Sequence, residues 1–134
     1  MFELPLFRKT LFVLCVVWFL DFIAQKFYLY WDFWWYDSLV HFLAGVCVAM
    51  GFILVTHWWT GVFPTFRKIF TISITSSIII GVLWEIFEVY FELTSLSDGV
   101  RFWSDTISDL LIDTLGGLLG GLYSWRVYKR TQLK

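Results

Sequence analysis

Four long apolar stretches limit what this chain can fold into. They cover residues 10–28, 38–58, 69–91 and 105–125. Each has roughly 17–25 residues, which is the length that an α-helix needs to cross a hydrocarbon layer of about 30 Å. The chain is 59% hydrophobic, 22% aromatic and only 16% charged, whereas soluble domains carry more charge and fewer aromatic residues. We therefore predict an all-α polytopic membrane protein, a four-transmembrane-helix bundle that forms a single membrane domain over residues 1–134.

The segment between the first two predicted spans is almost wholly aromatic. Residues 28–36 read YLYWDFWWY, with Asp32 as the charged member. Trp and Tyr gather at the membrane–water boundary because their rings are apolar while their polar groups favour water. We therefore expect an interfacial aromatic segment between spans 1 and 2.

The Lys and Arg residues are distributed unevenly over the predicted loops and termini. With four spans, two of them, Lys26 and Arg101, lie on one side of the membrane. The other eight lie on the opposite side: Arg8, Lys9, Arg67, Lys68, Arg126, Lys129, Arg130 and Lys134. Basic residues favour the cytoplasmic side, so we predict a cell (inner or plasma) membrane protein with both termini cytoplasmic. An odd number of spans would remove this asymmetry. The partner is then the lipid bilayer, and the formal net charge of −1 gives no indication of nucleic acid.

The last predicted span carries three aspartates on one helical face. Asp105, Asp109 and Asp113 are spaced by four residues, and Gly117 continues the same face toward the other end of the span. Ser104 is a plausible N-cap for this helix. Carboxylates inside an apolar span are costly and need a partner, so some other span must face them.

Two other predicted spans carry a matching pattern of polar and then small residues. On the second span it consists of Asp37, His41, Gly45 and Ala49, and on the third of Ser77, Gly81, Glu85, Glu88 and Glu92. In the predicted topology all three spans place their acids toward the outer leaflet and their small residues toward the inner leaflet. A rise of about 1.5 Å per residue puts the acidic groups at overlapping depths. We therefore predict that the three stripes face one another.

A divalent metal ion would resolve the electrostatic conflict among these acids. Carboxylates packed in a low dielectric cannot all be ionised unless they share protons or bind a cation, and no Lys or Arg lies at that depth of the three spans. Carboxylate and histidine ligands on facing helices build metal sites in four-helix bundles. The predicted ligands are Asp37, His41, Glu85, Glu88, Asp105, Asp109 and Asp113.

An oxygen-rich ligand set with one histidine favours Zn, Mn, Fe, Mg or Ca over a thiolate-type metal site. Such an ion can activate water or hold a phosphate. Glu85 and Asp109 are the candidate catalytic residues. An alternative stays open for Asp37, Asp105 and Asp109, because acids near a span end are also explained by solvation or by the helix dipole.

Three functions remain open at this point, and with them the question whether the protein is an enzyme. The first is a metal-dependent hydrolase or transferase that acts on a lipid-linked or envelope substrate at the outer leaflet. The second is a proton- or cation-translocating bundle, and the third is a non-catalytic structural or interaction membrane protein. Two overlapping GxxxG patterns could mediate a homo-oligomer or pack inside the bundle; they consist of Gly116, Gly117, Gly120 and Gly121.

The ordered motifs of the last three spans resemble those of a known group of proteins. The motifs are Asp37-x-x-x-His41-Phe42-x-x-Gly45, Trp84-Glu85-x-x-Glu88 and Asp105-Thr106-x-x-Asp109-Leu110-x-x-Asp113-x-x-Gly116-Gly117. They resemble small bacterial and archaeal integral membrane proteins of the YjdF-like type and, more loosely, of the VanZ-like type, which is associated with glycopeptide resistance. The resemblance implies that the seven predicted ligands belong together, but it implies no reaction.

Overall fold

The computed structural model describes residues 3–133, and these residues form helices and connecting turns without a strand. The elements are α1 (Glu3–Phe27), α2 (Leu29–Asp32), α3 (Tyr36–Thr60), α4 (Phe66–Tyr90), the 3-10 helix η1 (Leu96–Asp98) and α5 (Val100–Gln132). The all-α prediction is therefore confirmed. Among the described helices, α3 and α4 are long and apolar enough to cross a membrane. The four-span arrangement, which also needs α1 and α5 to cross, stays a prediction.

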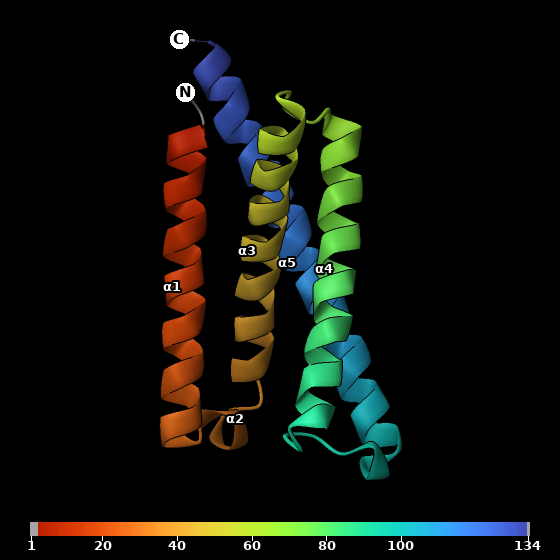
Figure 1. The fold of residues 1–134 in the computed structure, drawn as a ribbon. Coiled ribbons are helices and arrows are strands. Elements are labelled where there is room, and N and C mark those ends of the chain that lie inside the picture. Colours follow the sequence, from red (N-terminus) through yellow and green to blue (C-terminus); the bar gives the residue numbers. More distant parts are fainter. Residues whose placement is uncertain (1–2, 134) are drawn as a thin grey trace.

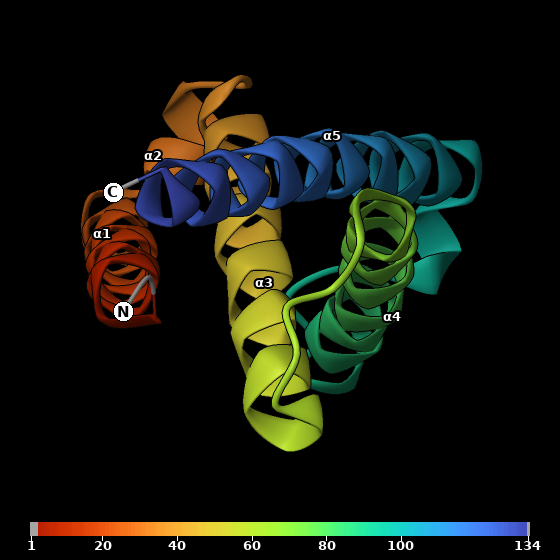
Figure 2. The ribbon, with the colours of Figure 1, turned by 90° about the horizontal axis from the view of Figure 1, so that it is seen from above.

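The four long helices alternate in direction along the chain (Figure 1). Both ends of the chain and the loop of residues 61–65 lie at one end of the bundle, and we call this the terminal end. The helices α2 and η1 lie at the opposite end, which we call the α2 end. Viewed from above, α1 is seen end on and α5 from the side, so α5 is strongly tilted across the bundle (Figure 2). Helix α3 packs against α1, α4 and α5 and is the centre of the structure.

Local signals in the sequence explain three of the helix ends. Helix α3 stops at Gly61, whose φ of 69° lets its N–H bond to the carbonyl of His57. The side chain of Thr65 caps α4 by accepting a bond from the N–H of Lys68 at 3.5 Å. The prediction of an N-cap at Ser104 is wrong, because α5 begins at Val100. The turn into α5 is made at Gly99 (φ 61°), and no helix-breaking residue separates it from Ser104.

Glycines let α5 approach its two neighbours closely. A Cβ atom on Gly116 would strike the carbonyl of Phe42 in α3, and one on Gly117 would strike the hydroxyl of Ser77 in α4. Gly120 and Gly121 repeat this division one turn later, against the carbonyl of Val46 and the hydroxyl of Ser73. The two GxxxG patterns are thus two adjacent contact faces inside one chain.

The predicted homo-oligomer through Gly116, Gly117, Gly120 and Gly121 therefore meets a physical obstacle. All four glycines are buried against α3 and α4. A second copy could reach them only if the bundle opened, so the packing inside the bundle accounts for these residues.

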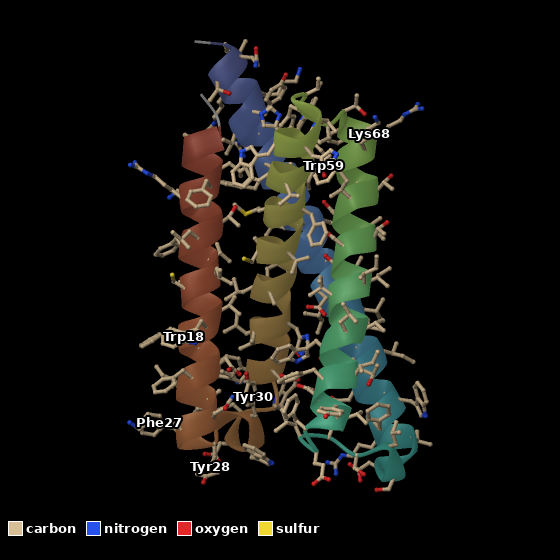
Figure 3. All side chains as sticks on the ribbon, in the orientation of Figure 1. Trp18, Phe27, Tyr28, Tyr30, Trp59 and Lys68 are labelled. Atoms are coloured by element: carbon tan, nitrogen blue, oxygen red, sulfur yellow. The ribbon has the colours of Figure 1, made fainter. Side chains whose placement is uncertain are left out.

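The outside of the bundle is covered by large apolar side chains. Trp18 and Phe27 of α1 and Trp59 of α3 are exposed, and the two α1 side chains point away from the bundle (Figure 3). In water, an apolar surface of this kind would cause aggregation, whereas lipid chains can cover it.

Two tyrosines fasten the aromatic segment to α1. The hydroxyl of Tyr30 donates to Asp21 Oδ1 at 2.8 Å, and the hydroxyl of Tyr36 donates to the carbonyl of Leu20 at 3.0 Å. Burial, together with the bond to Asp21, raises the pKa of Tyr30 well above its usual value. The indoles of Trp31 and Trp34 are 74% and 87% exposed, which suits the interfacial position predicted for this segment.

Candidate metal centre

His41 lies where α3 and α5 meet, in the half of the bundle nearer the α2 end. The residue is 6% exposed, and both of its ring nitrogens face carboxylates. Its Nδ1 is 3.3 Å from Asp113 Oδ2 on α5. Its Nε2 is 3.7 Å from Asp37 Oδ1, one turn earlier on α3. The prediction that Asp37 and His41 share a face toward the aspartates of α5 agrees with this geometry.

Three residues in this region could hold one ion. Asp37, His41 and Asp109 each offer a ligand atom, and these atoms all lie within 4.8 Å of one another. Two ligands of one ion lie at most about 4–5 Å apart, which is twice the usual distance from the metal to a ligand atom. The spacing is therefore compatible with a shared ion after small side-chain movements. Asp109 is buried, whereas the side chain of Asp37 is 36% exposed, so the group has one side open to its surroundings.

Asp113 is held in place by two glycines on the neighbouring helices. A Cβ atom on Gly45 of α3 would strike the backbone carbonyl of Asp113, and one on Gly81 of α4 would lie 2.7 Å from its Oδ2 atom. The absence of both side chains lets the carboxylate of Asp113 lie beside the imidazole of His41. The glycines predicted as packing residues thus also determine where a site residue lies.

The other predicted ligands lie outside the group of three. Glu85 is buried on α4, and its Oε2 accepts a hydrogen bond of 2.7 Å from the hydroxyl of Thr106 on α5. Glu88 is half-buried, and its Oε1 accepts a bond of 2.9 Å from the indole N–H of Trp84, one turn earlier on the same helix. Asp105 is exposed on α5, one turn before Asp109.

Positive charge is missing from this part of the molecule. Among the side chains that the structure describes, no Lys or Arg lies within 4.0 Å of these six carboxylates, and the nearby ion pairs involve His41 alone. A single imidazolium could balance one of the carboxylates at most. Buried carboxylates without a countercharge stay neutral or bind a cation, so the donor set fits a hard or borderline divalent ion.

Two features of the site were not found in the sequence. The first is the hydrogen bond from Thr106 to Glu85. Thr106 lies three residues before Asp109 and therefore near the acidic face of α5, and this spacing could have indicated that its hydroxyl faces the acids. Asp113 was predicted as a ligand, but its carboxylate faces His41 Nδ1 and does not belong to the group of three. Helical spacing alone cannot distinguish the position of Asp109, inside the group, from that of Asp113, because both residues lie on the same face of α5.

Comparisons with known proteins place the chain in a family. No curated protein and no solved structure matches it. One family model matches residues 1–130, and its description is "Predicted membrane protein (DUF2238)". That match covers nearly all of the chain and agrees with its apolar helices and lipid-compatible surface. The chain therefore belongs to the DUF2238 family of predicted membrane proteins.

Proposed function

We propose that this membrane protein binds a divalent metal ion through Asp37, His41 and Asp109. The observation that carries the proposal is the approach of one ligand atom from each residue to within 4.8 Å, on two helices and without a nearby Lys or Arg. Half-buried and buried carboxylates in an apolar bundle need such a partner.

The ring of His41 is the part of the site whose orientation matters most. With Nδ1–H donated to Asp113 Oδ2, the lone pair of Nε2 faces Asp37 and is free to bind an ion. A carboxylate behind a ligating histidine fixes its tautomer and increases its basicity. We therefore assign Asp113 to positioning His41. Asp105, Glu85 and Glu88 add negative charge around the group, and Asp105 does so from an exposed position.

We infer that the reaction is a hydrolysis or group transfer on a lipid-linked or envelope substrate. A bound Zn, Mn, Fe, Mg or Ca ion would supply a Lewis acid for a phosphoryl or carbonyl oxygen. Asp109 would then be a ligand and Glu85 the general base; the hydroxyl of Thr106 on α5 fixes the Glu85 carboxylate between α4 and α5. The open side at Asp37 is where a substrate would enter.

The membrane arrangement of this proposal follows from the charges. We propose one domain over residues 1–134 with four spans in the cell membrane. Seven of the basic residues lie on the helix segments next to the terminal end, which are the start of α1, the start of α4 and the end of α5, so that end would be cytoplasmic. The metal group would then face the outer leaflet. A relation to the YjdF-like and VanZ-like proteins remains a proposal that rests on the motifs.

Elemental analysis of the purified protein tests the metal site. We expect about one divalent ion per chain in the wild type and a large loss in Asp109→Asn and His41→Gln. Matched controls are Asp98→Asn, an exposed acid outside the group, and His57→Gln, the second histidine on α3. Equal metal content in all five proteins, or none in the wild type after loading with each candidate ion, would contradict the proposal.

Cation translocation is a second candidate, and one observation favours it. The hydroxyls of Ser73 and Ser77 are buried on the α4 face that also carries Glu85, and neither has a hydrogen-bond partner among the described residues. Together with Glu85 they form a row of polar side chains on α4 that runs from the acidic residues toward the terminal end. Both hydroxyls lie against the glycine backbone of α5, so there is little space for a cation beside this row.

Flux measurements in liposomes separate this candidate from the first. A proton or cation flux that is present in the wild type and absent in Glu85→Gln would support translocation. No flux, no bound metal and a thermal stability that is indifferent to chelators would leave the structural or interaction role as the remaining explanation.

A further inference from the structure

A groove lies between α3 and α4 on the outer surface of the bundle, away from the acidic residues. Its volume is about 260 Å³. Phe52 and Thr56 of α3 form one side, and residues of α4 form the other: Thr71, Ile72, Thr75, Ser76 and Ile79. The hydroxyls of Thr56 and Thr71 donate to carbonyls of their own helices, at Phe52 and Arg67. The groove therefore presents carbon atoms more than free polar groups.

The position of the groove matches one leaflet of a bilayer. From Thr71 to Ile79 it extends eight residues along α4, or about 12 Å at the helical rise. One leaflet contributes about half of a hydrocarbon layer of roughly 30 Å. Since α3 and α4 are long and apolar enough to span, a groove of this length fits the acyl chain of a lipid in the leaflet at the terminal end.

Two basic residues stand directly beyond the end of the groove. Arg67 precedes Thr71 by one turn, and Lys68 precedes Ile72 by one turn, so both belong to the α4 faces that line the groove. Both side chains are exposed, and no carboxylate in the described part of the chain lies within 4 Å of either. Trp59, which is 89% exposed, lies at the same end of the bundle (Figure 3).

We propose that this groove binds an anionic phospholipid, with an acyl chain between α3 and α4 and the phosphate at Arg67 and Lys68. Arg forms paired hydrogen bonds to phosphate, and Lys adds a point charge. Basic residues at the cytoplasmic ends of helices are the groups that attract anionic lipid headgroups. The charge complementarity selects the anionic lipid, because a zwitterionic headgroup would leave the two positive charges without a net partner.

Lipid binding to the purified full chain tests this proposal. Native mass spectrometry would measure retention of phosphatidylglycerol against phosphatidylcholine of the same acyl composition. We expect preferential retention of phosphatidylglycerol by the wild type and a loss of roughly tenfold or more in the Arg67→Ala/Lys68→Ala double variant, since each basic group near a membrane surface strengthens anionic lipid binding by about fivefold. The matched control is Arg8→Ala/Lys9→Ala, which removes the same charge at the same end of the bundle but away from the groove.

A second variant tests the groove without changing the charge. Thr75 is exposed on the groove wall, so Thr75→Phe should fill the space and leave the helix intact. We expect it to weaken retention of phosphatidylglycerol, whereas Ile78→Phe, at an exposed position outside the groove, should not. Equal loss in the Arg8/Lys9 control, equal retention of both lipids, or no effect of Thr75→Phe would overturn the proposal. The altered residues lie outside the group of Asp37, His41 and Asp109, so we expect unchanged metal content, and failure of the lipid proposal leaves the metal proposal untouched.

Discussion

Replacing Gly45 with alanine should both weaken the bundle and disturb the metal group. A Cβ atom at this position would overlap the backbone carbonyl of Asp113 and lie 2.8 Å from its carbonyl carbon. Both atoms belong to the backbone of α5, so α5 must move away from α3. The displaced segment carries Asp109 and Asp113, which are the α5 residues beside His41.

The expected magnitude follows from two opposing effects. Overpacking of a well-packed core costs about 1–3 kcal/mol, and the upper part of that range applies where backbone must shift. The higher helix propensity of alanine returns up to about 1 kcal/mol. We therefore expect Gly45→Ala to be destabilised by roughly 2 kcal/mol.

Gly51→Ala on the same helix is the matched control. The nearest atom to its added Cβ would be Thr10 Cγ2 at 4.0 Å, an ordinary contact. Propensity then acts alone, and the variant should be neutral or more stable by up to about 1 kcal/mol. Unfolding in one detergent, followed by circular dichroism, measures both variants. If Gly45→Ala is as stable as Gly51→Ala, the close approach of α3 and α5 described here is wrong.

Three further predictions follow from individual contacts. Gly81→Ala should leave global stability nearly unchanged, because Asp113 Oδ2 and Leu110 Cδ2 can both move. It should weaken metal binding measurably in a metal titration. An unchanged affinity would contradict the role of Gly81 in placing the Asp113 carboxylate. Asp113→Asn should lower metal affinity by about 10–100-fold with the metal stoichiometry retained, as expected of a residue that orients a ligand; loss of all bound metal would make Asp113 a ligand instead. Tyr30→Phe should cost about 1–3 kcal/mol in thermal unfolding at neutral pH, because Asp21 Oδ1 loses its donor while Gln25 Nε2 still donates to Oδ2. Since burial raises the pKa of Tyr30 above its usual 10.0, this contribution is fully present below pH 10 and is lost as the pH rises further; a stability difference between the wild type and Tyr30→Phe that does not shrink above pH 10 would count against it.

The helices and the shared depth of the acids could be predicted because both depend on periodicity. Four apolar stretches coincide with α1, α3, α4 and α5, and spacing by four residues placed Asp37, His41 and Asp109 on facing surfaces. These properties depend on the helical repeat, which sequence spacing reports directly. The start of α5 depended instead on the turn at Gly99, and so the N-cap predicted at Ser104 was wrong.

The rotation of each helix about its own axis could not be predicted to within one residue. Gly116 faces α3 while its neighbour Gly117 faces α4, and a single stripe on a helical wheel does not show this division. Glu88 shares a face with Glu85, yet its carboxylate binds Trp84 of its own helix. Rotamer choice and partner identity decide such cases, and both arise from tertiary packing.

X-ray absorption spectroscopy of the metal-loaded protein shows whether His41 and the neighbouring carboxylates bind the ion. It reports the elements bound to the ion and their distances, whatever the reaction. We expect one imidazole ligand together with carboxylate and water oxygens, and we expect the imidazole ring signal to disappear in His41→Gln and to remain in His57→Gln. A spectrum with oxygen ligands alone in the wild type, or an imidazole signal that survives in His41→Gln, would contradict the assignment of Asp37, His41 and Asp109 as the metal centre.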